Sequence, residues 1–289
     1  MLARPKHRKG GCLSRLITFL LLVFLLAYPF YQASILKVEE KTLEISSLDP
    51  ALDGLTIVYA TDIHQGPFFS QGRVNALVAQ INAFNADLVL LGGDYAIDSD
   101  SAINFFKNMP KIQAKRLVAG VVGNHDRTLP ESNLNLLQSA MVNAGVLPLV
   151  NATKEVRVGN AALYLAGVDD YNNGHPQVEQ VALNMREDDF VIFLTHSPDQ
   201  MPEAFQTKNG EGSTNWFDLS LAGHTHGGQV TLFGHPLFNP LTKADARYLS
   251  GWVQENKAAV LVSNGVGITD IPVRLFAPAQ LHVITLRQK

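Results

Sequence analysis

Four short apolar runs in the first two thirds of the chain each end directly in side chains that can bind a metal ion. The runs are rich in Val, Ile and Leu and are bounded by turn residues, as is typical of buried strands. They are Leu55–Thr61, Asp87–Gly92, Leu117–Gly123 and Phe190–Thr195. Between the first two, apolar residues recur at helical spacing from Val74 to Phe84 and predict a helix packed on the sheet. The alternation predicts one α/β domain whose strands end at a common edge.

Side chains of the metal-ligand type stand directly after these runs. They are Asp62, His64, Asp94, Asn124, His125, Asp126 and His196. A further apolar run, Leu219–Ala222, is followed by His224 and His226, which project to the same face of an extended segment. Each motif alone fits an ordinary strand-to-loop turn, but five of the nine histidines fall at these positions. The set therefore predicts a shared metal site at the strand ends.

The mixture of donors indicates a pair of cations. Carboxylates can bridge two cations, neutral imidazoles suit Mn, Fe or Zn, and an Asn carbonyl adds a neutral oxygen ligand. Two such ions about 4 Å apart acidify a bound water, clamp a phosphate and stabilise charge on the attacking and leaving oxygens. The residues thus predict a phosphoester hydrolase with two divalent metal ions, and the donor set leaves their identity open among Mn, Fe and Zn.

Residues 16–36 form a stretch of 21 residues without a formal charge, bounded by Arg15 and Lys37. At about 1.5 Å per residue it is long enough to cross a hydrocarbon core of roughly 30 Å. Five basic residues precede it, which predicts a single-pass anchor with the N-terminus in the cytoplasm and the body on the periplasmic or extracellular side. Two alternatives stay open: a cleaved signal peptide, and a helix broken at Pro29 that lies in one leaflet with the body facing the cytoplasm.

The formal charges divide the chain into two oppositely charged parts. Residues 1–37 carry +6, whereas residues 38–289 carry −9. A body of this sign lacks the basic stripe that supplies most affinity for phosphodiester backbones, so we expect no general nucleic-acid binding. We expect a basic tail at 1–15, a transmembrane signal-anchor at 16–36, a connector at 37–53 and one catalytic domain at 54–289.

The ordered motifs resemble those of the calcineurin-like metallophosphoesterases. The matching blocks run from about Ile57 to Gly228 and are Asp62-Ile63-His64, Gly93-Asp94, Gly123-Asn124-His125-Asp126, Thr195-His196 and Gly223-His224-Thr225-His226. The tail, with Asn264-Gly-Val-Gly267 and Pro272-Val-Arg274, is similar to the membrane-associated bacterial branch of YaeI- and YkuE-type phosphodiesterases. The resemblance implies two mixed β-sheets packed as a sandwich and flanked by α-helices, with a dinuclear metal centre at one edge.

By position, the resemblance also implies a role for each motif residue. One metal would be held by Asp62, His64 and His226, the other by Asn124, His196 and His224, with Asp94 as the bridge. His125 would contact the phosphate or protonate the leaving oxygen, with Asp126 orienting its ring, and an imidazole suits this task near neutral pH. The motif Gly93-Asp94 is followed by Asp98, one residue later than is usual in the family, so a supporting role of Asp98 stays open. Arg274 is a candidate for binding a phosphate oxygen, and a solvated Arg is the alternative.

The residues and the resemblance together predict a membrane-anchored phosphodiesterase or pyrophosphatase of the bacterial inner membrane. Attack by metal-bound hydroxide would cleave the phosphate ester. The anchor keeps the domain at the bilayer, so we expect an amphiphilic substrate such as a phospholipid or UDP-2,3-diacylglucosamine, which the resemblance also implies. Two alternatives stay open, a catalytically silent metal-binding scaffold and a secreted soluble phosphatase, because a fold does not guarantee an activity.

Overall fold

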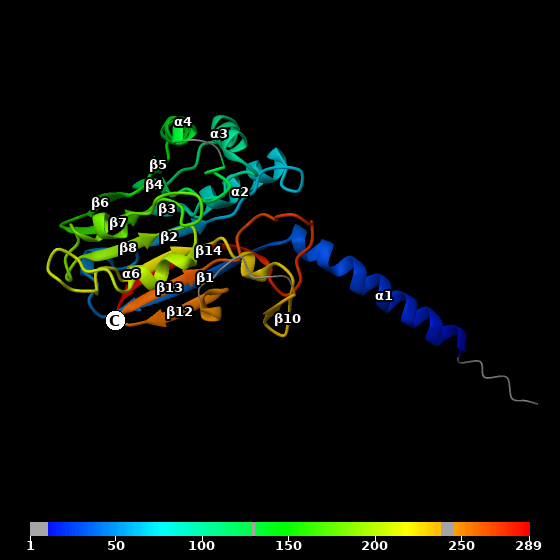
Figure 1. The fold of residues 1–289 in the computed structure, drawn as a ribbon. Helices are drawn as coiled ribbons and strands as arrows, with labels where there is room; N and C mark the ends of the chain where they lie inside the picture. Colours follow the sequence, from blue (N-terminus) through cyan, green and yellow to red (C-terminus); the bar gives the residue numbers. More distant parts are fainter. Residues whose placement is uncertain (1–10, 129–130, 238–244) are drawn as a thin grey trace, which may run out of the picture.

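The apolar runs of the first half, together with the C-terminal strand, build a six-stranded sheet in the computed structural model, which describes residues 11–128, 131–237 and 245–289. In spatial order the strands are β1 (Leu36–Ile45), β14 (Ala279–Gln288), β2 (Thr56–Ala60), β3 (Leu88–Leu91), β4 (Leu117–Gly120) and β5 (Leu147–Pro148). The strands β2 to β5 are parallel, which requires crossover connections. The helices α2 (Gln71–Ala83), α3 (Ser99–Asn108) and α4 (Glu131–Asn143) make these connections and cover the outer face (Figure 1).

The later runs build a second six-stranded sheet that packs against the first. In spatial order its strands are β12 (Gly251–Glu255), β13 (Ala258–Val262), β9 (Leu219–Ala222), β8 (Phe190–Leu194), β7 (Ala161–Gly167) and β6 (Ala152–Val158). The four central strands are parallel to one another. The edge strand β12 is antiparallel to β13, and the edge strand β6 is antiparallel to β7. Apart from the N-terminal helix, the remaining elements are α5 (Val178–Ala182), α6 (Met201–Ala204), the hairpin of β10 (Thr231–Leu232) and β11 (His235–Pro236), and 3-10 turns at Pro50–Leu52, Pro198–Gln200, His226–Gly228 and Ala246–Tyr248. The predicted sandwich of two mixed sheets flanked by helices is confirmed.

Alternation of side chains along the strands divides the apolar residues between two layers. In β2, Ile57 and Tyr59 belong to the layer between the two sheets, whereas Val58 and Ala60 belong to the layer under the helices. A strand that is buried on both faces explains why its sequence is apolar without a break.

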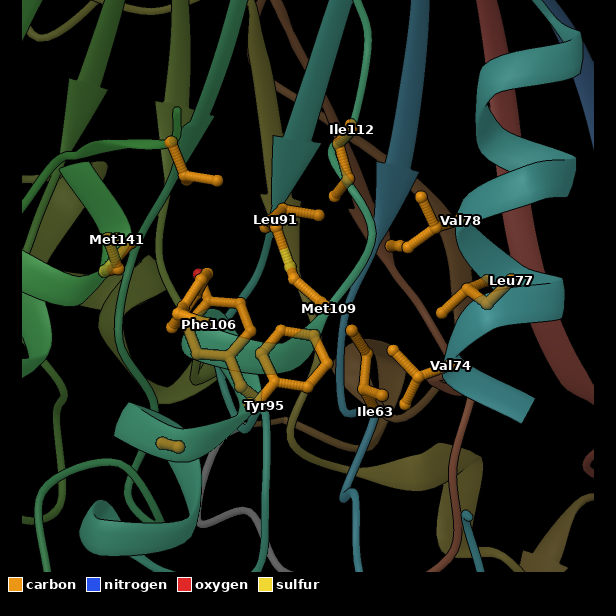
Figure 2. Packing of buried hydrophobic residues seen from close by; sticks show 14 of the residues in the cluster. Ile63, Val74, Leu77, Val78, Leu91, Tyr95, Phe106, Met109, Ile112 and Met141 are labelled. Carbon is orange, nitrogen blue, oxygen red and sulfur yellow. The ribbon is translucent and has the colours of Figure 1, made fainter. Parts of the chain in front are cut away.

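The α2 helix illustrates how the outer layer is closed. Its side chains Val74, Leu77 and Val78 recur at helical spacing and are buried. Figure 2 shows these three side chains pointing towards the sheet, where Ile63 and Leu91 belong to the same cluster. Burial of each such side chain contributes about 1.5–3 kcal/mol relative to its exposure to water. This packing fixes the region where β2 and β3 end and where the polar side chains begin.

The segment 37–53, which we expected to be a connector, contains most of an edge strand of the first sheet. The β1 strand begins at Leu36 and pairs in parallel with β14 along its ten residues. It lies at the edge of the sheet, where charged side chains reach solvent and discourage pairing with other chains. The strand is hard to recognise in the sequence because half of its residues are charged, namely Lys37, Glu39, Glu40, Lys41 and Glu44.

The α1 helix (Gly11–Ser34) precedes β1 and extends away from the two sheets (Figure 1). Within the described part of the chain it is the one helix long and apolar enough to cross a membrane, over Leu13–Ser34. Most of its side chains are exposed, and Ala33 near its end is buried. The helix continues through Pro29, so the break that we considered there does not occur. Most of the expected basic tail, residues 1–10, lies outside the described residues.

Candidate metal centre

The residues expected to bind metal lie just beyond the carboxyl ends of five strands. Asp62 and His64 follow β2, Asp94 follows β3, Asn124 follows β4, His196 follows β8, and His224 and His226 follow β9. The loops are tied together by backbone hydrogen bonds, among them one of 2.9 Å from the N–H of Gly223 to the carbonyl oxygen of His196. The two sheets thereby bring together side chains as distant in sequence as His64 and His226, which are 162 positions apart.

Left-handed backbone turns give most of these loops their shape. Five of the residues have positive φ angles: Asp62 (54°), His64 (47°), Asp94 (54°), His224 (69°) and His226 (52°). A non-glycine residue in this region costs of order 1–3 kcal/mol and persists only where the surrounding structure enforces it. Here the N–H of Asp62 donates to the carbonyl oxygen of Gly93, and the N–H of His64 donates to that of Asp94, each at 3.0 Å. Such clustered strain is typical of functional sites.

Asp62, His64 and His226 form the first donor group. Their ligand atoms all lie within 4.8 Å of one another, and all three side chains are buried. The Nε2 atoms of His64 and His226 are 3.1 Å apart, and Nε2 of His226 lies 3.5 Å from Oδ1 of Asp62. A hydrogen bond between the two ring nitrogens would use only one hydrogen. A cation placed among the two nitrogens and the carboxylate oxygen would instead be bound by all three atoms. The arrangement therefore fits a divalent metal.

Asp94, His196 and His224 form the second donor group, with Asn124 beside it. The ligand atoms of the three residues lie within 4.8 Å of one another, and Oδ1 of Asn124 is 3.2 Å from Nε2 of His196. Asp94 also reaches the first group, because its Oδ2 lies 3.3 Å from Nε2 of His196 and 3.4 Å from Nε2 of His64. One carboxylate thus stands between the two groups.

Burial sets the charge states of these side chains. It raises the pKa of Asp62 to about 6 and lowers the pKa of His64 to about 3. Burial also acts to raise the pKa of Asp94, but the positive charge of His196 and its hydrogen bond outweigh that effect and hold the pKa below its usual range. A neutral imidazole and an ionised carboxylate are the forms that bind a divalent cation, so His64 and Asp94 are in the binding form. In spite of burial, the nearby carboxylates raise the pKa of His196, and a metal would have to displace its proton.

Two glycines allow the loops to approach the donors. A Cβ atom at Gly223 would collide with Oδ2 of Asp62, and one at Gly123 would collide with Oδ1 of Asp94. A side chain at either position would displace a carboxylate from the centre. The small residues of these motifs are therefore required by the close approach of neighbouring backbone.

His125 lies at the edge of the centre and is half-buried. Its ring meets that of His64 edge to face, with 4.8 Å between the ring centroids. Its Nδ1 lies 2.9 Å from the carbonyl oxygen of Ile97, and a carbonyl only accepts, so Nδ1 carries the hydrogen of this bond. Ile97 therefore orients the ring and leaves Nε2 as the nitrogen able to exchange a proton.

Asp126 has other partners than the ring that we expected it to orient. Its buried carboxylate accepts hydrogen bonds from the backbone N–H groups of Asp94 at 2.7 Å, Gly123 at 2.9 Å and Tyr95 at 3.1 Å. Burial and the nearby charge of Asp94 raise the pKa of Asp126 to about 8. The structure thus makes Asp126 a positioning residue for the turn that carries Asp94, whereas its orientation of the His125 ring stays a prediction.

The structure gives partners to Arg274 and Asp98, whose roles the sequence left open. Arg274 is fully buried, and its guanidinium donates to the carbonyl oxygens of Asn264, Gly267 and Ala277 at 2.7–2.8 Å. It is therefore a buried Arg whose donors serve protein carbonyls, which fits neither of the two roles that we considered, phosphate binding and a solvated side chain. The side chain of Asp98 accepts from the N–H of Ser101 at 2.7 Å and caps α3.

Sequence reasoning missed the loop at 169–174, which follows β7. There Nδ2 of Asn172 lies 3.4 Å from Nε2 of His224, and Nδ2 of Asn173 donates to the carbonyl oxygen of Asn124 at 2.8 Å. The loop thus supports residues of the second donor group. Two Asp residues directly follow the apolar run of β7, so the strand-end pattern that identified the other loops was present here as well.

The sequence matches the family model of the calcineurin-like phosphoesterases over residues 55–228. The metallophosphoesterase YkuE of Bacillus subtilis (strain 168) is 25% identical over 264 residues, which cover 89% of this chain and 88% of that protein. The phosphodiesterase YaeI of Escherichia coli (strain K12) is 30% identical over 220 residues, or 73% of this chain and 74% of that protein. A transmembrane protein with a metallophosphoesterase domain from Danio rerio is 27% identical over 87% of this chain and 57% of its own length.

These matches agree with the molecule as described. The family model extends from the start of the first buried run to the glycines after His226, and it therefore spans the strand ends that carry the two donor groups. Carboxylates, imidazoles and an amide oxygen gathered at such an edge are the donors that a hydrolytic metal centre needs. The chain belongs to the calcineurin-like phosphoesterase family and is a metal-dependent phosphoester hydrolase.

Proposed function

We propose that this protein is a membrane-anchored phosphodiesterase or pyrophosphatase with two divalent metal ions, and that it hydrolyses a phosphate ester of a lipid or of a nucleotide-linked lipid. The observation that carries the proposal is the position of Asp94. Its Oδ2 lies at almost equal distances, 3.4 Å and 3.3 Å, from His64 of one donor group and His196 of the other. A carboxylate between two groups of ligands supports a pair of cations that share it.

In this proposal each donor group holds one ion. Asp62, His64 and His226 would hold the first, Asn124, His196 and His224 would hold the second, and Asp94 would be shared by both. Mn, Fe and Zn all fit this nitrogen and oxygen donor set. When bound, the ions supply the acidification of water and the neutralisation of phosphate charge that hydrolysis requires.

His125 is the group that we assign to proton transfer. Its Nε2 lies on the ring edge away from the Ile97 carbonyl, and the ring stands beside His64. When Nε2 is protonated as well as Nδ1, the ring can deliver the Nε2 proton to the leaving oxygen. General acid catalysis of this kind assists poor leaving groups most.

The membrane part of the proposal is supported by α1 and by the name of the Danio rerio relative. We place the protein in the bacterial inner membrane as a single-pass protein, with the catalytic domain on the periplasmic or extracellular side because the basic residues precede the span. A cytoplasmic catalytic domain is the alternative. An anchored domain meets amphiphilic phosphate esters at the bilayer surface, such as a phospholipid or UDP-2,3-diacylglucosamine.

The test is hydrolysis by the full chain in detergent after loading with Mn²⁺, Fe²⁺ or Zn²⁺. The substrates are bis(p-nitrophenyl) phosphate, p-nitrophenyl phosphate and UDP-diacylglucosamine. We expect metal-dependent cleavage of a diester or of the UDP-lipid, and loss of turnover and of at least one bound ion in Asp94→Asn. His175→Ala is the matched control, because His175 is exposed and belongs to neither donor group.

Three outcomes would contradict parts of the proposal. Absence of turnover with two ions bound would favour a metal-binding scaffold, and cleavage restricted to soluble monoesters would exclude the lipid substrate class. A mature N-terminus beyond residue 36 would show that the apolar segment is a cleaved leader. Protease digestion of intact spheroplasts distinguishes an external catalytic domain from a cytoplasmic one.

A further inference from the structure

We propose that the β10–β11 hairpin and the segment before β14 form a second membrane-contact surface beside α1, which enters the headgroup region of the bilayer. The surface consists of Leu232, Phe233, Leu237, Ile271 and Phe276, and we call it the interfacial surface. This inference rests on the proposed anchoring by α1, but it adds a contact that a simple tether would not have.

The residues of the interfacial surface are large, apolar and exposed. Phe233 is 90% exposed and Phe276 is 61% exposed, and the three aliphatic side chains are also exposed. Residues 226–237 contain no Asp, Glu, Lys or Arg, so the hairpin carries no formal charge apart from a titratable His235. Soluble surfaces rarely gather such side chains, whereas interfacial membrane contacts are built from them.

Backbone strain at two of these positions also supports a membrane contact. Phe233 has a φ of 51° and Phe276 has a φ of 57°, and among the described non-glycine residues with positive φ these two are the hydrophobic ones. Phe233 and Gly234 form the two-residue turn of the hairpin, where Asn-Gly is the favoured pair. A bulky aromatic side chain is strained in this conformation and gains no burial within the protein. Contact with an apolar phase outside the protein would explain both the strained backbone and the exposure of these two Phe side chains.

Hydrogen bonds place the interfacial surface against the end of α1. The N–H of Phe276 donates to Oε1 of Gln32 at 2.9 Å, and the N–H of Arg274 donates to the carbonyl oxygen of Pro29 at 3.0 Å. With a rise of about 1.5 Å per residue, both acceptors lie within roughly 8 Å of the end of the helix at Ser34. A helix that spans the bilayer therefore holds Phe276 at the depth of the headgroups.

The hairpin is joined to this same segment. The N–H of Thr231 donates to the carbonyl oxygen of Leu275 at 2.9 Å, and Val230 forms β-bridges with Leu275 and Phe276. Figure 1 accordingly shows β10 beside the base of α1. The exposed tip at Phe233 is thus fixed to the side of the body on which the anchor enters the membrane.

Two loops that carry metal-ligand candidates also reach this region. The hairpin begins only a few residues after His226. After His64, the chain reaches Phe68, whose carbonyl oxygen accepts from Arg73, and Arg73 also donates to the carbonyl oxygen of Ala33 in α1. Contact of the interfacial surface with lipid would therefore orient the metal centre relative to the bilayer and present lipid-linked phosphates to it.

The test uses the full chain reconstituted in vesicles of phosphatidylethanolamine and phosphatidylglycerol, with and without brominated lipid as a quencher of Trp fluorescence. Phe233→Trp is compared with Leu136→Trp, which places the same reporter at an exposed apolar position on α4, far from α1 in Figure 1. We expect the emission added by Phe233→Trp to shift to the blue and to be quenched by brominated lipid. The emission added by Leu136→Trp should show neither change.

Flotation of the vesicles separates the two proposals. If the parent protein does not float with the vesicles, the proposed anchoring fails. If it floats but Phe233→Trp is quenched no more than Leu136→Trp, the anchoring stands and the interfacial surface is overturned. A blue shift without quenching by brominated lipid would assign the surface to contacts between copies of this chain and would also overturn the proposal.

Discussion

The backbone N–H of Arg274 donates a hydrogen bond of 3.0 Å to the carbonyl oxygen of Pro29. The guanidinium of Arg274 extends the other way, where it donates to the carbonyl oxygen of His226 at 3.3 Å and lies 3.3 Å from Nδ1 of its ring. A single buried residue thus connects the end of the apolar helix with a metal-ligand candidate. The link explains how a helix outside the body can be held in a fixed relation to the site.

Arg274→Lys should destabilise the protein, because an ammonium group cannot reproduce the planar fork that serves several carbonyl oxygens. We expect the free energy of unfolding to fall by about 3 kcal/mol, since buried acceptors lose their donors. Denaturant unfolding of the full chain in detergent measures the change. The matched substitution Arg247→Lys affects a half-exposed ion pair with Glu255 and should cost less than about 1 kcal/mol. Equal effects of the two substitutions would show that Arg274 does not hold the loops.

Asp126→Asn tests whether Asp126 positions the turn of Asp94. The carboxylate accepts three backbone N–H groups, and an amide would place a donor against one of them. We expect the affinity for Mn²⁺ and the rate of hydrolysis to fall together, by roughly 10–100-fold. Metal titration by calorimetry measures the first effect. If the metal affinity stayed unchanged and the loss resembled that of His125→Ala, Asp126 would act through the ring of His125 instead.

His125→Ala should reveal the proton donor through the leaving group. An alkyl leaving oxygen needs a proton, whereas p-nitrophenolate departs without one. Turnover of an alkyl phosphodiester should therefore fall by roughly 10²–10⁴-fold, and turnover of bis(p-nitrophenyl) phosphate should fall much less. His175→Ala should leave both rates unchanged. A uniform loss on both substrates in His125→Ala would argue for phosphate binding rather than proton transfer.

His282 lies outside the metal centre and should make the free energy of unfolding depend on pH. Its ring is buried in β14, with Nε2 3.0 Å from Oγ of Ser263, and burial lowers the pKa to about 4. The ordinary pKa of His is about 6.5, so between these values the unfolded chain binds more protons and the free energy of unfolding rises with pH. The stabilisation is complete above about pH 6.5 and is lost as the pH falls towards 4.

Between pH 7 and pH 5 this group should remove about 2 kcal/mol of stability. His282→Gln should abolish that part of the pH dependence, and His175→Gln, at an exposed position, should retain it. Denaturant unfolding of the full chain at several pH values measures the slopes. Identical slopes in the parent and in His282→Gln would contradict the assignment.

The sheets and the donor residues were accessible from the sequence because their signals are local. An unbroken apolar run such as that of β2 indicates a strand buried on both faces, and the polar residues that follow it, Asp62 and His64, stand at its end. The β1 strand was missed because charged residues alternate imperfectly along an edge strand, and its pairing with β14 links opposite ends of the chain. Such a pairing produces no local sequence pattern in either strand.

The sequence by itself therefore determined the fold class, the family and the residues from which a metal centre can be built. Only the tertiary structure decided the partners of the supporting residues, because a hydrogen bond depends on which distant segments meet. Asp126 binds the turn of Asp94 and leaves the ring of His125 to the Ile97 carbonyl, and these contacts join positions about thirty residues apart. Arg274 likewise became a buried link between α1 and the centre through its hydrogen bonds with Pro29 and His226, and neither partner lies near it in the chain.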